Sequence, residues 1–101
     1  MYILIPCDGT DEKNSKITTL AERLKWAFID FDNGHVKSTQ FFDEREEAGV
    51  DWIDFVILAN KYENYLDFMN EGMMCLVRRE EETLEEVMSA FVFKELDEIG
   101  M

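Results

Sequence analysis

Cys7 is the side chain of this sequence best suited to metal or redox chemistry. It ends an apolar run, residues 2–7, and Asp8 and Gly9 follow it directly. A thiolate at the carboxyl end of a strand can serve as a metal ligand or as a redox thiol. The carboxylates that follow, beginning with Asp8, should raise the thiol pKa and so disfavour the thiolate. A structural role for Cys7 is therefore favoured over a functional one, with the functional role kept open.

A second polar pair follows another apolar run. Residues 55–59 are apolar, and Asn60 and Lys61 come next. If the two runs form parallel neighbouring strands, their carboxyl ends share one edge of the sheet, where ligands of α/β proteins bind. The predicted ligand-binding mouth therefore consists of Cys7, Asp8, Gly9, Asn60 and Lys61.

Other groups that could support catalysis or metal binding are few. The sequence has two cysteines and one histidine, whereas zinc and iron–sulfur sites need several converging ligands. His35 follows an Asn-Gly turn, where we expect it to be exposed, and Cys75 falls in an apolar run, where Cys behaves as a small hydrophobe. Asp8 and Asp30 could approach each other as a two-metal hydrolase requires. We expect no enzyme activity, and the metal-dependent hydrolase is the least favoured alternative.

The charge of the chain argues against several partners. It carries 23 acidic and 10 basic residues, a net charge of −13 at pH 7. Nucleic acids and anionic membranes are bound mainly through Lys and Arg, so we expect neither as a partner. The longest apolar run is far shorter than the roughly 20 residues of a membrane span, which favours a cytoplasmic protein. The acidity suits a basic protein partner or a cationic ligand, although solubility alone is the simpler explanation.

The second half of the chain predicts parallel strands joined by helices. Residues 55–59 and 73–77 are short apolar runs of the kind that form strands buried on both faces. A stretch with helical periodicity follows each of them. Such alternation joins parallel strands through right-handed crossovers and favours sites at the strand carboxyl ends.

Both predicted helices carry start signals. Asn60 and Glu63 have the spacing of a capping box for a helix that ends at Gly72, and Thr83 and Glu86 have it for a second helix. Apolar side chains at helical spacing should face the sheet. These are Tyr62, Tyr65, Leu66 and Met69 in the first helix and Leu84, Val87, Met88 and Phe91 in the second.

The first half predicts three antiparallel strands, at residues 2–7, 26–31 and 36–42. Between the last two, Asn33-Gly34 is a dipeptide that prefers a type I′ hairpin turn. About ten residues then remain before the fourth strand, room for one or two helical turns at 45–49. The sequence therefore predicts a single α/β domain, residues 1–101. Its mixed five-stranded sheet has the order 3-2-1-4-5, with helices on its faces.

Several short fragments follow one another in a recognisable order over nearly the whole chain. They are ILIPCDG at 3–9, SKI at 15–17, WAFIDF at 26–31, GVD at 49–51, DFVI at 54–57, EGM at 71–73 and TLEE at 83–86. In order and spacing they resemble the dinitrogenase iron–molybdenum cofactor biosynthesis domain family. The resemblance implies a ribonuclease-H-like fold and a role as a small carrier or accessory protein for a metal cluster. The cofactor that the resemblance implies is an iron-containing cluster.

The chain departs from this family where its members hold clusters. Such members usually have a Gly- and His-containing loop and a full helix between the third and fourth strands. Here residues 43–48 contain neither Gly nor His, and Ala59-Asn60-Lys61 replaces glycines after the fourth strand. Cys7, helped by Asp8, is then the one strong metal ligand expected, so any cluster should be weakly held or shared across a dimer.

The shortened connection also predicts an interface. One sheet face should be thinly covered near the third strand, and Phe41, Phe42 and Trp52 are available to cover it. Because incompletely covered apolar patches promote association, we expect a homodimer or a protein partner there. A non-catalytic carrier or accessory protein is thus the favoured function. The main alternative is a pure protein–protein interaction module that has lost its ligand.

Overall fold

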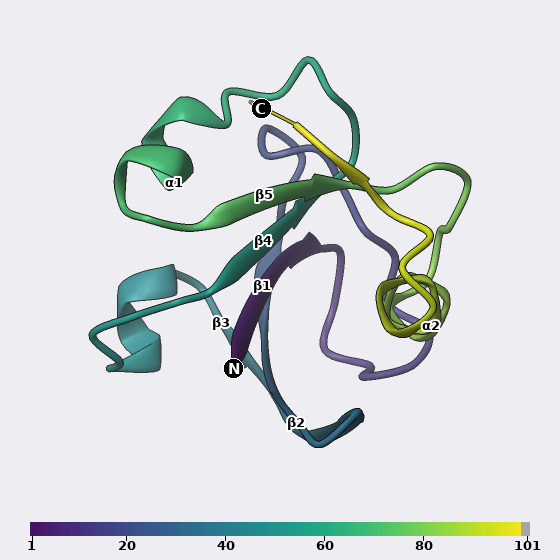
Figure 1. The fold of residues 1–101 in the computed structure, drawn as a ribbon. Coiled ribbons are helices and arrows are strands. Elements are labelled where there is room, and N and C mark those ends of the chain that lie inside the picture. The colour runs from purple at the N-terminus through teal and green to yellow at the C-terminus, as the bar shows by residue number, and fades with distance from the viewer. Residues whose placement is uncertain (100–101) are drawn as a thin grey trace.

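The structure, a computed structural model, describes residues 1–99. Its six strands form one sheet with the order β3-β2-β1-β4-β5-β6. Helices cover both faces of this sheet (Figure 1). The elements are β1 (Tyr2–Cys7), β2 (Lys25–Asp32), β3 (His35–Phe42), the 3-10 helix η1 (Arg45–Ala48), β4 (Phe55–Leu58), α1 (Leu66–Asn70), β5 (Met74–Val77), α2 (Leu84–Val92) and β6 (Asp97–Glu98).

The strand order confirms the predicted mixed sheet and adds a strand to it. β1 is antiparallel to β2 and parallel to β4, and β4 is parallel to β5. The predicted count of five strands is wrong, because β6 pairs antiparallel with the end of β5 through Leu76–Glu98 and Val77–Asp97. Two exposed acidic residues show no periodicity that would predict a strand.

The sheet separates two apolar cores. The α2-face core contains Ile3 and Ile5 of β1 together with Leu84 of α2. The α1-face core, which also includes residues next to η1, contains Leu4 of β1 and Phe68 of α1. Successive residues of a strand point to opposite faces, so β1, central and almost fully buried, contributes to both cores.

The hairpin of β2 and β3 and the helix α2 form as the sequence predicts. Asn33 and Gly34 both have positive φ angles, 52° and 79°, as a type I′ turn requires. In α2 the Thr83 side chain accepts a hydrogen bond from the Glu86 N–H, and the Glu86 side chain caps in return. The predicted buried stripe of α2 is confirmed, with Phe91 half-buried at its end.

The first predicted helix is much shorter than expected. α1 begins at Leu66, and its buried residue is Phe68. The predicted capping box does not form, because the Asn60 side chain accepts the Tyr62 N–H and the Glu63 carboxylate accepts the N–H of Leu20. Tyr62 is 84% exposed and Leu66 is 55% exposed, so the predicted stripe is wrong at both positions.

The three predicted interface residues do not form one patch. Phe41 packs against the α2-face core and Phe42 against the α1-face core, as neighbours on a strand must. Trp52 is 57% exposed and lies over Gly72. η1 contacts β2 and β3, and its Ala48 packs against the same core as Phe42.

Cys7 and Cys75 are free and buried. They lie on β1 and β5, which β4 separates as predicted, and they belong to opposite cores. No helix in the described part of the chain has the length and apolar character needed to cross a membrane.

Candidate functional site

The predicted mouth lies where the parallel strands end, and the chain itself closes it. The segment 8–24 leaves β1 and folds back along this edge, pairing Cys7 with Ile17 and Lys16 with Thr83. The Ile17 N–H donates to the carbonyl of Glu82 at 2.9 Å, and the Asp8 N–H donates to the carbonyl of Lys16 at 3.0 Å. The loop thus links the end of β1 to the start of α2.

The amino end of α2 is occupied by the same loop. The first N–H groups of a helix have no partner within it and commonly bind anions. Here the Leu84 N–H donates to the carbonyl of Ser15 at 2.9 Å, and the Glu85 N–H donates to the carbonyl of Lys13 at 3.1 Å. The Glu86 N–H bonds to the Thr83 hydroxyl at 3.2 Å. Three donors that could hold a phosphate or carboxylate are therefore already used.

Cys7 lies beneath this loop and is not exposed at all. Its thiol donates to the carbonyl of Gly9 at 3.4 Å and to that of Lys25 at 3.6 Å. Burial raises the pKa of the Cys7 thiol, and the charge of Asp8 raises that pKa further. The sequence correctly indicated the effect of Asp8 on the pKa, but the expectation that Cys7 is accessible at the mouth is wrong, because the returning loop covers it.

The other four predicted mouth residues reach the same sheet edge, where each has a local role. The Asp8 carboxylate accepts the Lys16 N–H at 2.8 Å. A Cβ on Gly9 would lie 3.2 Å from the Ser15 hydroxyl, so Gly9 permits a close approach of the loop. The Asn60 side chain caps a turn, and the Lys61 ammonium lies 5.4 Å from the centre of the Tyr62 ring.

Arg78 is a residue of this edge that the sequence analysis missed. Its Nε donates to the carbonyl of Ala59 at 3.1 Å, and its Nη1 donates to that of Glu81 at 2.8 Å. The guanidinium thus fastens the end of β4 to the turn after β5. A cation directly after a buried strand is the signal that could have indicated this contact.

The carboxylate pair considered for a hydrolase is separated. Asp8 follows Cys7, which pairs with Lys25, whereas Asp30 pairs with Tyr2 at the opposite end of β1. Six residues of strand span roughly 20 Å, too far for two carboxylates to share metal ions. Within residues 1–99 no three His, Cys, Asp or Glu side chains gather as a metal site would need.

Asp11 stabilises the loop that closes the mouth, in a pH-dependent way. Hydrogen bonds from the N–H groups of Asn14 and Lys13 hold the pKa of Asp11 below its ordinary value of 3.8. A lowered pKa stabilises the folded state above the unfolded-state pKa, and this contribution is lost as the pH falls through the folded-state value. We expect Asp11→Ala to destabilise the protein at pH 7 and this difference from wild type to shrink below about pH 4.

Urea denaturation of both proteins between pH 7 and pH 2.5 measures this difference. Glu12→Ala is the control, since it removes a neighbouring exposed carboxylate from the same loop. A difference for Asp11→Ala that is independent of pH would contradict the role of the ionised carboxylate.

The fold of this chain is that of a group of small α/β proteins with known structures. A protein from Methanocaldococcus jannaschii, provisionally named a dinitrogenase, superposes with a TM-score of 0.76 at 19% identity, over 99% of this chain and 95% of its own. A Thermotoga protein, provisionally named NifB and assigned to the DUF35 family, superposes with a TM-score of 0.72 at 19% identity, over 99% of this chain and 94% of its own. At such identities the likeness establishes the fold alone.

No protein-family model matches the chain, and no curated protein matches it. The two structural relatives support the dinitrogenase-like fold that the sequence resemblance implies.

Proposed function

We propose that this protein is a non-catalytic accessory protein that acts by binding another protein. One observation carries the proposal: the mouth at the strand carboxyl ends is filled by the chain's own loop. The Ser15 and Lys13 carbonyls occupy the amino end of α2, and Cys7 lies covered beneath the loop. The first N–H groups of α2 and the Cys7 thiol, which could recognise a small ligand at this edge, are engaged within the protein.

A cluster carrier needs accessible thiolates, and Cys7 supplies a poor one. Iron–sulfur and related clusters are held mainly by deprotonated cysteines. Burial raises the pKa of the Cys7 thiol and so disfavours the thiolate, and releasing the thiol for a metal would require the segment 8–24 to leave α2. The structural relatives are named after dinitrogenase and NifB, and these names support the accessory role that we propose for this chain.

Anaerobic reconstitution with iron and sulfide, followed by desalting, tests the choice between protein binding and cluster carriage. We expect far less than one iron per chain on the wild type, and the same low value on Cys7→Ala and Cys75→Ala. Cys75 is the matched control, because it is also a buried strand cysteine, 1% exposed. Molybdenum is measured in the same samples after addition of molybdate.

Near-stoichiometric iron that survives desalting, and that Cys7→Ala alone removes, would overturn the proposal. It would show instead that the protein carries a cluster through Cys7. Circular dichroism of both variants establishes that they remain folded, so that loss of iron cannot be mistaken for loss of structure.

A further inference from the structure

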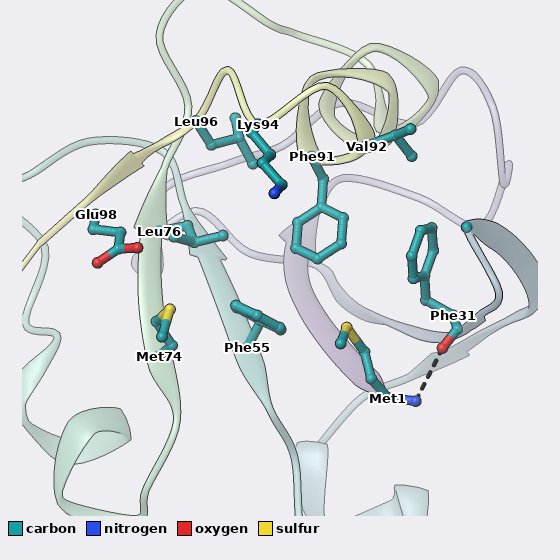
Figure 2. Close-up of a pocket in the computed structure, with 11 residues that line it drawn as sticks. Met1, Phe31, Phe55, Met74, Leu76, Phe91, Val92, Lys94, Leu96 and Glu98 are labelled. Atoms are coloured by element: carbon teal, nitrogen blue, oxygen red, sulfur yellow. Dashed lines mark hydrogen bonds between the residues drawn. The ribbon is translucent and has the colours of Figure 1, made fainter.

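An apolar groove of about 560 Å³ lies at the opposite end of the sheet from the mouth. It opens on the α2 face, where β4 and β5 begin. Figure 2 shows Phe55 and Met74 on these strands, with Phe91 of α2 and Leu96 above them. The five residues of the predicted mouth do not line this groove, so it is a separate place on the molecule.

The size and the lining of the groove are those of a small-molecule site. Such sites enclose about 300–1,000 Å³ and are lined mainly by apolar and aromatic side chains, with a few polar groups among them. Phe91 packs edge-on against Phe31 and Phe55, with ring centres 5.3 and 5.1 Å apart, which gives the groove an aromatic floor. Met74 and Val92 also line the groove and are 44% and 43% exposed, so burial by a ligand would remove apolar surface from water.

The charged groups of the lining favour an anionic ligand. Two are cations, Lys94 and the amino group of Met1, and one is a carboxylate, that of Glu98. The whole chain has the opposite balance, with 23 acidic and 10 basic residues. The Met1 amino group donates to the Phe31 carbonyl at 2.9 Å, whereas Lys94 forms no ion pair among the described residues. Lys94 is thus the cation with which a ligand can pair.

The backbone at Lys94 is a second observation that points to a ligand. α2 ends at Val92, and Lys94 follows its cap with a φ angle of 58°, in the left-handed region. Glycine is the usual residue at this position, because a side chain there is strained. Strained backbone conformations gather at functional sites. Here the conformation accompanies a lysine whose ammonium points into the groove (Figure 2).

We propose that the groove binds a small apolar carboxylate. Its hydrocarbon part lies over Phe55 and Phe91, and its carboxylate pairs with Lys94. A single negative charge matches one ammonium, whereas a doubly charged phosphate would be repelled more strongly by Glu98 and by the net charge of −13. This site goes beyond the protein-binding role proposed above and does not depend on it.

Octanoate is the probe, titrated into protein that is isotopically labelled in its methionine methyl groups. The nuclear magnetic resonance signal of Met74 should shift, with a dissociation constant of about 1 mM or below. Met73 is the internal reference, because it belongs to the α1-face core and its signal should stay in place. Octylammonium has the same hydrocarbon chain and the opposite charge, and it should bind at least about fivefold more weakly.

Three variants separate the charge of Lys94 from its structural effect. Lys94→Met keeps an unbranched side chain and should weaken octanoate binding about fivefold. Lys37→Met is the matched control, since Lys37 is exposed on β3 outside the groove, and it should bind octanoate like the wild type. Lys94→Gly should weaken binding equally while raising the urea midpoint of unfolding, because glycine adopts a φ angle of 58° without strain.

An unchanged Met74 signal in the presence of octanoate would overturn the proposal. Equal binding of octylammonium, or undiminished binding of octanoate by Lys94→Met, would do so as well, because the ammonium would then play no part. A shift of Met73 as large as that of Met74 would also overturn it, since octanoate would then not be confined to the groove.

Discussion

Replacing Leu84 with alanine should lower the free energy of unfolding by about 3 kcal/mol, because it leaves a cavity in the α2-face core. Leu84 is 1% exposed and begins α2. Leu66 begins α1 in the same way, yet it is 55% exposed. Leu66→Ala should therefore change the stability by about 0.5 kcal/mol or less, as exposed substitutions usually do.

Urea denaturation of the two variants measures this contrast directly. The pair is matched in residue type and in position within its helix, so burial is the main difference between them. A large loss of stability in Leu66→Ala would mean that this leucine faces the sheet, as the sequence pattern predicted. Equal and small losses would contradict the packing of α2.

Gly72→Ala should also be costly, for two separable reasons. Gly72 has a φ angle of 90°, a conformation that costs an alanine about 1–2 kcal/mol. In addition, a Cβ at this position would lie 2.7 Å from the Trp52 ring, which must then move. Moving the ring breaks the hydrogen bond of 3.2 Å from Trp52 Nε1 to the Asp54 carboxylate, worth about 1 kcal/mol.

Gly34→Ala is the control for the backbone effect, because Gly34 has a φ angle of 79° and its Cβ would meet nothing within 4 Å. We expect Gly72→Ala to be the more destabilising by about 1 kcal/mol, and to change the emission of Trp52 in the folded protein. In a Trp52→Ala background the extra loss should vanish. If it persists, the contact between Trp52 and Gly72 is not its cause.

The sheet could be predicted from the sequence because its signals are local. Each of the first five strands is an apolar or alternating run bounded by turn residues, and the Asn33-Gly34 dipeptide defines the hairpin. β6 has only two acidic residues, and its pairing depends on where the chain returns after α2. That return is a tertiary feature which a local pattern does not encode.

α1 was mispredicted because neither of its two expected capping residues bonds to the other: Asn60 caps the turn at Tyr62, and Glu63 bonds to a distant segment. Asn60 and Glu63 have the right spacing for a capping box, but Glu63 accepts the N–H of Leu20, which is 43 positions away in the sequence. This contact leaves Tyr62 exposed and delays the helix until Leu66. Local preference was overridden by a long-range hydrogen bond.

The sequence predicted that the five mouth residues share one edge of the sheet, but it did not predict that Cys7 is buried there. The strand order places Cys7, Asp8 and Asn60 at one edge, as the parallel pairing of β1 and β4 requires. The loop that covers Cys7 contains no apolar run, and long-range hydrogen bonds to Pro6, Glu82 and the start of α2 hold it there. The groove on the α2 face, lined by Phe55, Met74 and Phe91 among others (Figure 2), was not predicted, because its residues come from five separate segments.

The two thiols are buried on opposite faces of the sheet, so each can report when the structure on its own face opens. Cys7 and Cys75 lie on different sides of the sheet, so neither can reach the other while the strands remain paired. Reaction of either thiol with an external reagent requires the protein to open first, and its rate then follows the free energy of that opening. Cys7 would report on release of the loop from α2, and Cys75 on separation of the helix α1 from the other face. The molecule thus contains two independent internal probes of which of its layers loosens first.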